Sequence, residues 1–213
     1  MTPAVDSKTL SLGVVILAAG ASTRMGRPKM LLPWGTTSIL GHLIHQWSSL
    51  LATQIAVVCA AGDNAIREEL GRLEFPDENR ILNPSPERGM FSSIQCAARW
   101  DGWRPGLTHW TIVLGDQPHL RPDTLRALLD FGAAHQGKIC QPSRQGKPRH
   151  PVLLPGAAFG RLKDAPEDVL KKFLQNNLDD LACCEIDDPG LDADLDRPED
   201  YERALQHFFP EAK

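Results

Sequence analysis

Three short apolar runs, separated by segments with helical spacing, set the architecture that is open to this chain. The runs are VVIL at residues 14–17, IAVVCA at 55–60 and TIVL at 111–114. Short apolar runs bounded by turn signals are typical of strands that are buried on both faces of a parallel sheet. The alternation with helical segments therefore predicts an α/β fold in which helices cover both faces of the sheet.

The segments between these runs carry apolar residues at helical spacing. A helix is predicted over about residues 38–51, with Thr37 or Ser38 as its N-cap, and Asp63 could cap the next helix. Pro122 and Pro198 stand where a first helical turn is expected. Further helices are predicted from Phe91 or Ser92 and over 166–177, and shorter strands at KICQP (138–142), HPVLLP (150–155) and LACCEI (181–186), the last of them buried.

Length, charge and cysteine content exclude several classes of protein. The 213 residues predict one domain over 1–213, and the formal net charge of −4 provides no overall positive field for nucleic acid or an anionic membrane. The first residues, MTPAVDSKTLSL, lack the pattern of a secretory signal, and no segment is long enough to span a bilayer. The five cysteines show no zinc-type spacing, so we expect reduced thiols and a cytoplasmic location.

A small, basic loop, LAAGASTRMGRPK, follows the first strand at residues 17–29. Ligands of α/β sheets bind where strands end, and small residues let phosphate oxygens approach backbone N–H groups. Arg24 and Lys29 supply the positive charge that a polyphosphate requires. The loop matches neither the Walker A pattern nor GxGxxG, which argues against P-loop kinases and Rossmann dehydrogenases. The alternative is an ordinary glycine-containing turn whose basic side chains are solvated.

Asp116 follows the strand at 111–114 after a single glycine. Its carboxylate should therefore lie at the same edge of the sheet as the basic loop. A carboxylate beside substrate phosphates is the setting in which proteins usually bind Mg²⁺. The alternative is a turn aspartate that caps the helix beyond Pro122.

Five blocks of the sequence occur in a shared order along nearly the whole chain: LAAGASTRMGRPK (17–29), NPSPERGMFSSIQ (83–95), GDQPHL (115–120), RHPVLLP (149–155) and DLDRPEDY (194–201). Together they resemble the MobA-like NTP transferase family, which includes the molybdenum cofactor cytidylyltransferases. The resemblance implies a three-layer αβα, Rossmann-like, mostly parallel sheet of the nucleotide-diphospho-sugar transferase type. It also implies a nucleotide-binding N-terminal half and an acceptor-binding C-terminal half.

The resemblance implies a role for individual residues. Asp116 would hold a catalytic Mg²⁺, and Asp194 is preferred over Asp196 as second ligand because Asp196 could instead cap the helix at Pro198. Residues 89–93 would contact the base, with a serine-capped helix as the alternative. The implied nucleotide-binding residues are Leu17, Ala18, Ala19, Gly20, Arg24, Lys29, Gly89, Ser92 and Ser93. The implied catalytic residues are Arg24, Lys29 and Asp116, and the implied metal ligands are Asp116 and Asp194. His150, which could equally be structural, would lie on the acceptor side.

The implied reaction is nucleotidyl transfer, in which an acceptor phosphate attacks the α-phosphorus of a nucleoside triphosphate and pyrophosphate leaves. No general base is needed, because a phosphomonoester has a second pKa of about 6 and is largely ionised at pH 7. The cytidylyl branch of the family reads Leu-Ala-Ala-Gly, as here, so the leading hypothesis is a Mg²⁺-dependent CTP:molybdopterin cytidylyltransferase that serves a recipient molybdoenzyme. LKDAPEDVLKKFL (162–174) replaces the usual pterin-side motif. A transferase acting on a sugar or alcohol phosphate, or a non-catalytic cofactor-binding chaperone, therefore stays an alternative.

Overall fold

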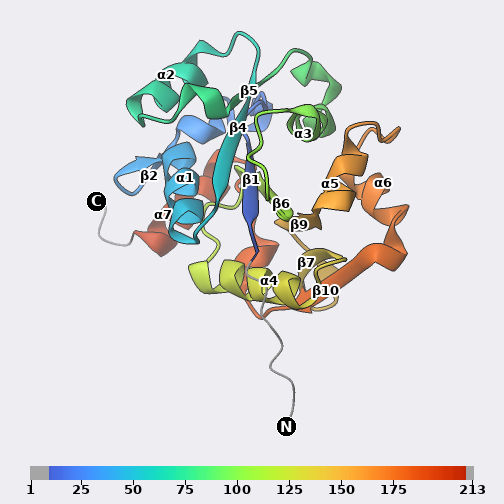
Figure 1. Cartoon of the computed structure of the whole chain (residues 1–213). Helices are drawn as coiled ribbons and strands as arrows, with labels where there is room; N and C mark the ends of the chain where they lie inside the picture. Colours follow the sequence, from blue (N-terminus) through green and yellow to red (C-terminus); the bar gives the residue numbers. More distant parts are fainter. Residues whose placement is uncertain (1–9, 210–213) are drawn as a thin grey trace.

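An eight-stranded sheet forms the centre of the computed structural model, which describes residues 10–209 (Figure 1). The strands lie in the order β10-β7-β9-β6-β1-β4-β5, with β8 paired to β7. They are β1 (Leu12–Leu17), β4 (Gln54–Ala60), β5 (Arg80–Asn83), β6 (His109–Leu114), β7 (Ile139–Arg144), β8 (Lys147–Pro148), β9 (Val152–Pro155) and β10 (Leu181–Glu185). Strands β6, β1, β4 and β5 pair in parallel, as do β7 and β10, whereas β9 runs antiparallel between β6 and β7. The predicted mostly parallel sheet is confirmed.

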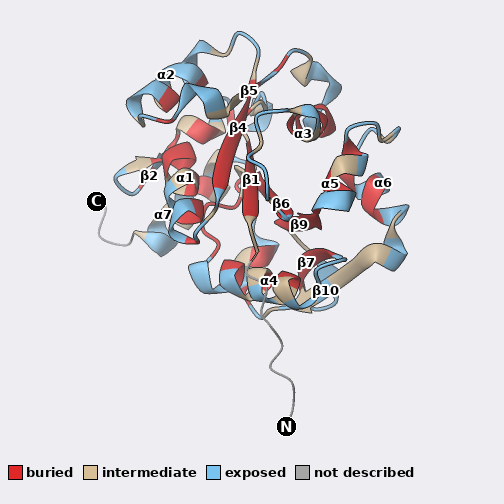
Figure 2. Ribbon diagram, viewed as in Figure 1, coloured by how far each residue is buried: buried red, intermediate tan, exposed pale blue. Residues whose placement is uncertain are grey.

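Helices cover both faces of this sheet and bury its strands (Figure 2). Val14 and Ile16 of β1 belong to one apolar core, and Val15, which points to the opposite face, belongs to the other. The first core includes side chains of α1 (Ile39–Ser49), α2 (Asn64–Arg72), α4 (Pro122–Ala134) and α7 (Pro198–Phe208), and the second those of α3 (Met90–Arg99), α5 (Gly156–Leu162) and α6 (Leu170–Gln175). The three-layer αβα arrangement is therefore confirmed.

Local signals at the helix ends are largely confirmed. The hydroxyl of Ser38 accepts a hydrogen bond from the N–H of Gly41, which selects Ser38 over Thr37 as the cap of α1. Asp63 likewise accepts from the N–H of Ile66 at the start of α2. Helices α4 and α7 begin at Pro122 and Pro198, as predicted.

Other expectations about single elements were wrong. The helix expected over 166–177 begins only at Leu170, and Cys183, expected in a buried strand, is exposed because β10 lies at the edge of the sheet. A short hairpin of β2 (Pro33–Trp34) and β3 (Thr37–Ser38) was not predicted, nor were β5 and α5. Residues 1–9, most of the segment tested for a secretory signal, lie outside the described residues.

Two further observations concern the cysteines and the lengths of the helices. All five cysteines lie among them, and none takes part in a disulfide. Within residues 10–209, no helix has the length and apolar character required to cross a membrane.

Candidate active site

A cleft of about 630 Å³ opens at the carboxyl ends of β1, β4 and β6. The last residues of these strands, Leu17, Ala60 and Leu114, form part of its wall. The loops that follow β1 and β6 and the segment that enters α3 supply much of the rest. Eight of the predicted site residues therefore share one cavity: Leu17, Ala19, Gly20, Arg24, Lys29, Gly89, Ser93 and Asp116.

The loop after β1 leaves backbone donors free at the cleft. Ala18 is buried, and its N–H is used in the sheet, where it donates to the carbonyl of Val58. Among the described residues, the N–H groups of residues 19–21 have no hydrogen-bond acceptor. Free N–H groups at the end of a strand are suited to bind phosphate oxygens.

A bend at Ser22 turns the loop so that Lys29 faces the cleft. Ser22 has a left-handed backbone conformation with φ of 49°, and Gly26 adopts a similar one with φ of 65°. The hydroxyl of Ser22 accepts a hydrogen bond of 3.0 Å from the N–H of Lys29. This hydrogen bond closes the loop across residues 22–29 and holds the backbone of Lys29 in place.

Both cations of the loop are paired with one carboxylate, that of Asp196. Arg24 Nη1 lies 2.6 Å from Asp196 Oδ2, and Lys29 Nζ lies 3.8 Å from Asp196 Oδ1. The alternative that Asp196 caps α7 is therefore wrong, since the N-cap is Arg197, whose N–H donates to Asp200. An anion bound by Arg24 and Lys29 would take the place that Asp196 holds.

Asp116 enters the cleft from the turn after β6. Its oxygen Oδ1 is buried and has no hydrogen-bond partner among the described residues. Burial raises the pKa of the Asp116 carboxyl; Lys29 opposes this shift, and the charges of Asp194 and Asp196 add to it. The residue does not cap α4, which has Arg121 as its N-cap. A buried carboxylate oxygen without a donor is a strong candidate to bind a cation.

The turn that carries Asp116 fits tightly against the basic loop. A side chain at Gly115 would place its Cβ 2.2 Å from the sulfur of Met30, which follows Lys29 directly. Any larger residue at position 115 would therefore force the Met30 side chain to move. Met30 was not singled out from the sequence, because its contact is made across more than eighty residues of chain.

Asp194 lies beside this turn but does not line the cleft. Its oxygen Oδ1 accepts a hydrogen bond of 3.0 Å from Gln117 Nε2, and the N–H of Leu195 donates to the carbonyl of Asp116 at 2.9 Å. Among residues 10–209, no three acidic, histidine or cysteine side chains form a ready metal cage. Mg²⁺ needs fewer protein ligands than that, because substrate phosphates and water complete its shell. The unpaired oxygen of Asp116 and the neighbouring Asp194 fit such an ion.

The two serines at the start of α3 differ in what their hydroxyls do. Asn83 Nδ2 donates to Ser92 Oγ at 2.8 Å and to Ser93 Oγ at 2.9 Å. The hydroxyl of Ser92 donates in turn to the carbonyl of Gly89 at 2.7 Å, whereas Ser93 lines the cleft. Gly89, with φ of 89°, is the N-cap, so the alternative of a serine-capped helix is wrong. The amide of Asn83 thus orders both serine hydroxyls at this rim of the cleft.

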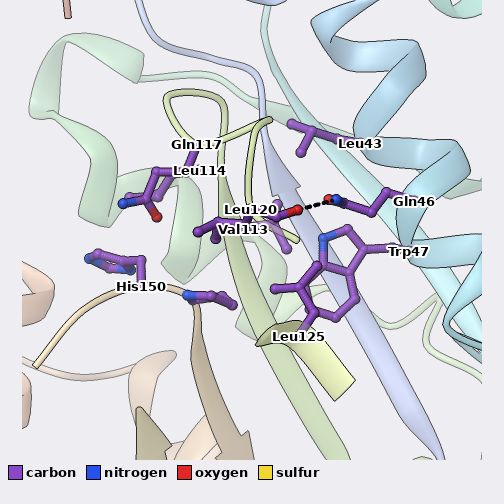
Figure 3. Close-up of a pocket in the computed structure, with 10 residues that line it drawn as sticks. Leu43, Gln46, Trp47, Val113, Leu114, Gln117, Leu120, Leu125 and His150 are labelled. Atoms are coloured by element: carbon purple, nitrogen blue, oxygen red, sulfur yellow. Dashed lines mark hydrogen bonds between the residues drawn. The ribbon is translucent and has the colours of Figure 1, made fainter. Parts of the chain in front are cut away.

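His150 lies outside the cleft, in a small cavity of about 10 Å³ (Figure 3). Gln46 and Gln117 line the same cavity, which borders the cleft through Leu114. The His150 side chain is half-buried, and burial lowers its pKa, although the charge of Asp194 opposes that shift. A histidine with a lowered pKa is neutral at pH 7.

Comparison with known proteins gives one family match and several relatives. A family model described as the MobA-like NTP transferase domain matches residues 14–181. The molybdenum cofactor cytidylyltransferase of Escherichia coli (strain K12) is 26% identical over 203 residues, which cover 93% of this chain and 97% of that protein. The bifunctional protein GlmU of Pseudomonas syringae pv. syringae is 35% identical over 125 residues, 57% of this chain. The matched region spans 25% of the length of that GlmU protein.

Solved structures share the fold along most of the chain. The Rv0371c protein of Mycobacterium tuberculosis H37Rv is 25% identical and aligns with a TM-score of 0.73 over 92% of this chain and 98% of its own. A second structure of that protein, in complex with manganese, aligns with a TM-score of 0.64 at 24% identity. The alignment covers 92% of this chain and 98% of that one. A nucleotidyl transferase from Methanothermobacter thermautotroptrophicus aligns with a TM-score of 0.75 at 21% identity, over 94% of this chain and 98% of its own.

Proposed function

The chain belongs to the MobA-like NTP transferase family, a family of nucleotidyltransferases, and we propose that it transfers CMP from CTP to molybdopterin with release of pyrophosphate. The observation that carries this proposal is the convergence of Arg24, Lys29 and Asp116 on one cleft at the carboxyl edge of the sheet. The cavity of about 630 Å³ thus brings the two cations of the loop to the same space as the carboxylate of Asp116, an arrangement suited to a metal-bound triphosphate.

The chain's own groups have distinct tasks in this reaction. The N–H groups of residues 19–21 bind phosphate oxygens, and Arg24 and Lys29 offset the charge that builds up on the departing pyrophosphate. A Mg²⁺ ion held by Asp116 and Asp194 would supply Lewis-acid stabilisation to the triphosphate. The acceptor phosphate is already ionised at pH 7, so no side chain has to remove a proton from it.

Substrate choice is the finer part of the proposal. The Leu-Ala-Ala-Gly sequence of the loop and the similarity to the Escherichia coli cytidylyltransferase favour CTP and a pterin acceptor. We assign base contact to the segment 89–93. Ser93 rather than Ser92 faces the base, because the hydroxyl of Ser92 already donates a hydrogen bond to the carbonyl of Gly89. The nucleotide then occupies the N-terminal half of a single domain and the acceptor the C-terminal half, near His150. A cytoplasmic location, with transfer of the product to a molybdoenzyme, completes the proposal.

Pyrophosphate release with a panel of substrates tests this function. Purified protein and Mg²⁺ are incubated with each of CTP, GTP, ATP and UTP, with and without molybdopterin. We expect release with CTP that depends on the pterin. Release with GTP in place of CTP would contradict the base assignment, and no release with molybdopterin would contradict the acceptor.

Sugar and alcohol phosphates in the same assay address the second enzymatic candidate. The segment LKDAPEDVLKKFL (162–174), which stands in place of the usual pterin-side motif, is the observation that favours it. CTP-dependent release with a sugar phosphate alone would support that candidate. Tight nucleotide binding without turnover for any acceptor would instead support a cofactor-binding chaperone.

A further inference from the structure

Gln117 links the two loops that carry the proposed metal ligands. It follows Asp116 directly, and its Nε2 donates to Asp194 Oδ1 at 3.0 Å. A second bond joins the same loops through the backbone, from the N–H of Leu195 to the carbonyl of Asp116 at 2.9 Å. Residues separated by more than seventy positions are thereby held side by side.

The two ends of this side-chain bond differ in exposure. Gln117 is 7% exposed, whereas Asp194 is an exposed residue. A buried amide keeps its position because leaving it unpaired would cost free energy. An exposed carboxylate, in contrast, can rotate in water unless a donor holds it. The buried glutamine is therefore the fixed partner, and it determines where the aspartate points.

The chemistry of glutamine suits this task. Asp116 and Asp194 repel one another, since the charge of Asp194 contributes to the raised pKa of Asp116. A lysine or arginine at position 117 would orient Asp194 but would also neutralise it and compete with a cation. A neutral amide orients one oxygen of Asp194 and leaves its charge available.

We propose that Gln117 is a positioning residue that holds Asp194 beside Asp116, so that both carboxylates reach the same divalent cation. This inference rests on the proposed metal role of the two aspartates. Hydrogen-bonding partners of metal ligands commonly affect metal affinity by about 10- to 100-fold. Gln117 does not line the cleft, and its role is to act through Asp194.

Gln46 of α1 offers a matched control, because it bonds to the same loop. Its Nε2 donates to the carbonyl of Leu120 at 2.7 Å, and it is 6% exposed (Figure 3). Like Gln117, it lines the small cavity beside His150. It thus supports the loop after β6 from α1, but makes no hydrogen bond to either aspartate. Gln46→Met and Gln117→Met remove the same kind of bond from the same region.

Binding of Mn²⁺ in the presence of an α,β-methylene analogue of CTP tests the inference without turnover. The free ion is counted by its electron paramagnetic resonance signal. We expect Gln117→Met to weaken Mn²⁺ binding by about 10- to 100-fold and Gln46→Met to change it by less than about twofold. Equal weakening in both variants, or none in Gln117→Met, would overturn the inference. If Gln117→Met fails to fold, Gln117→Asn, which keeps a shorter amide donor, replaces it with the same expected direction.

Asp194→Asn separates this inference from the function on which it rests. If Asp194→Asn leaves Mn²⁺ affinity unchanged, the proposed metal role of Asp194 fails. If Asp194→Asn weakens binding while Gln117→Met does not, the inference about Gln117 alone fails. In the double variant we expect Gln117→Met to add less than about twofold to the loss already caused by Asp194→Asn, because residues in one network are not additive.

Discussion

Asp116 combines an unfavourable environment with a proposed task. One of its oxygens is buried without a donor, and burial raises the pKa of its carboxyl. A buried carboxylate without a hydrogen-bond donor is typical of functional sites, and a bound cation would supply the missing partner. The sequence predicted this residue from its place after a strand, but not that its oxygen would be left unpaired.

Asp116→Asn should abolish turnover and leave the protein folded. We expect kcat to fall by about a hundredfold or more, because Lewis-acid stabilisation is worth several kcal/mol. The thermal unfolding temperature at pH 7, measured without metal, should not decrease, because a neutral amide replaces a poorly solvated carboxylate. A variant that keeps near-normal kcat would contradict the metal role of Asp116.

The helix-cap role that the sequence suggested for Asp196 was wrong. Its place before Pro198 suggested a helix cap, yet it pairs with Arg24, 172 positions away. A local sequence pattern can indicate a helix cap, but it carries no information on an ion-pair partner so distant in the chain. The structure makes Asp196 a competitor for the two cations that would bind phosphate.

Asp196→Asn should therefore strengthen binding of the triphosphate. The ion pair is largely exposed, and exposed pairs contribute about 0.2–1 kcal/mol, so we expect Kd for CTP to fall by about 1.5- to 5-fold. Calorimetric titration at low salt measures this effect, which should shrink as salt is added. Weaker binding in the variant would show that Asp196 assists the nucleotide instead of competing with it.

At the scale of elements, the strands and helices next to the cleft were the most predictable. β1, β4 and β6 are central strands with continuous apolar runs, and their burial on both faces leaves a clear pattern. Edge elements were less predictable, because β10 pairs on one side only and β5 has four residues. The loop after β1 was recognised by its motif, while the bond that closes it depends on the bend at Ser22.

Ser22→Ala tests how far that bond organises the loop. Removing a hydroxyl that accepts from the N–H of Lys29 should raise KM for CTP by about 2- to 10-fold, since such a bond is worth about 0.5–1.5 kcal/mol. Ser48→Ala, which removes a hydroxyl bonded to the carbonyl of Ile44 on α1, serves as control and should leave KM unchanged. Identical kinetics for both variants would show that the loop is held by other contacts.

At the scale of the whole molecule, the antiparallel strand β9 separates two parallel parts of the sheet. The parallel part that contains β1 carries the basic loop at residues 17–29 and Asp116. Connections from the part that contains β7 and β10 lead to Asp194 and Asp196. The five sequence blocks predicted that these segments belong together. Their relative placement depends on long-range strand pairing, which the pattern of a single sequence does not reveal.

Stability should fall as the pH is lowered, in part through His109. Burial lowers the pKa of His109 below its usual 6.5, with Gln136 opposing the shift, so the unfolded chain takes up the proton more readily than the folded protein. Below pH 6.5, protonation therefore favours unfolding, by at most about 1.4 kcal/mol per pH unit for one histidine. Thermal unfolding at pH 7.5 and 5.5 should show a smaller loss for His109→Gln than for the unaltered protein. An equal loss in both would assign the effect to other groups.

In the proposed reaction, a nucleotidyl group leaves CTP and joins the acceptor. CTP labelled at the α-phosphorus, and in parallel at the γ-phosphorus, is incubated with protein, Mg²⁺ and molybdopterin, and the products are separated. We predict that the α-label appears in the pterin product and the γ-label in pyrophosphate, in equal amounts. Transfer of the γ-label to the acceptor, or an α-label that stays with CTP, would contradict the proposed reaction.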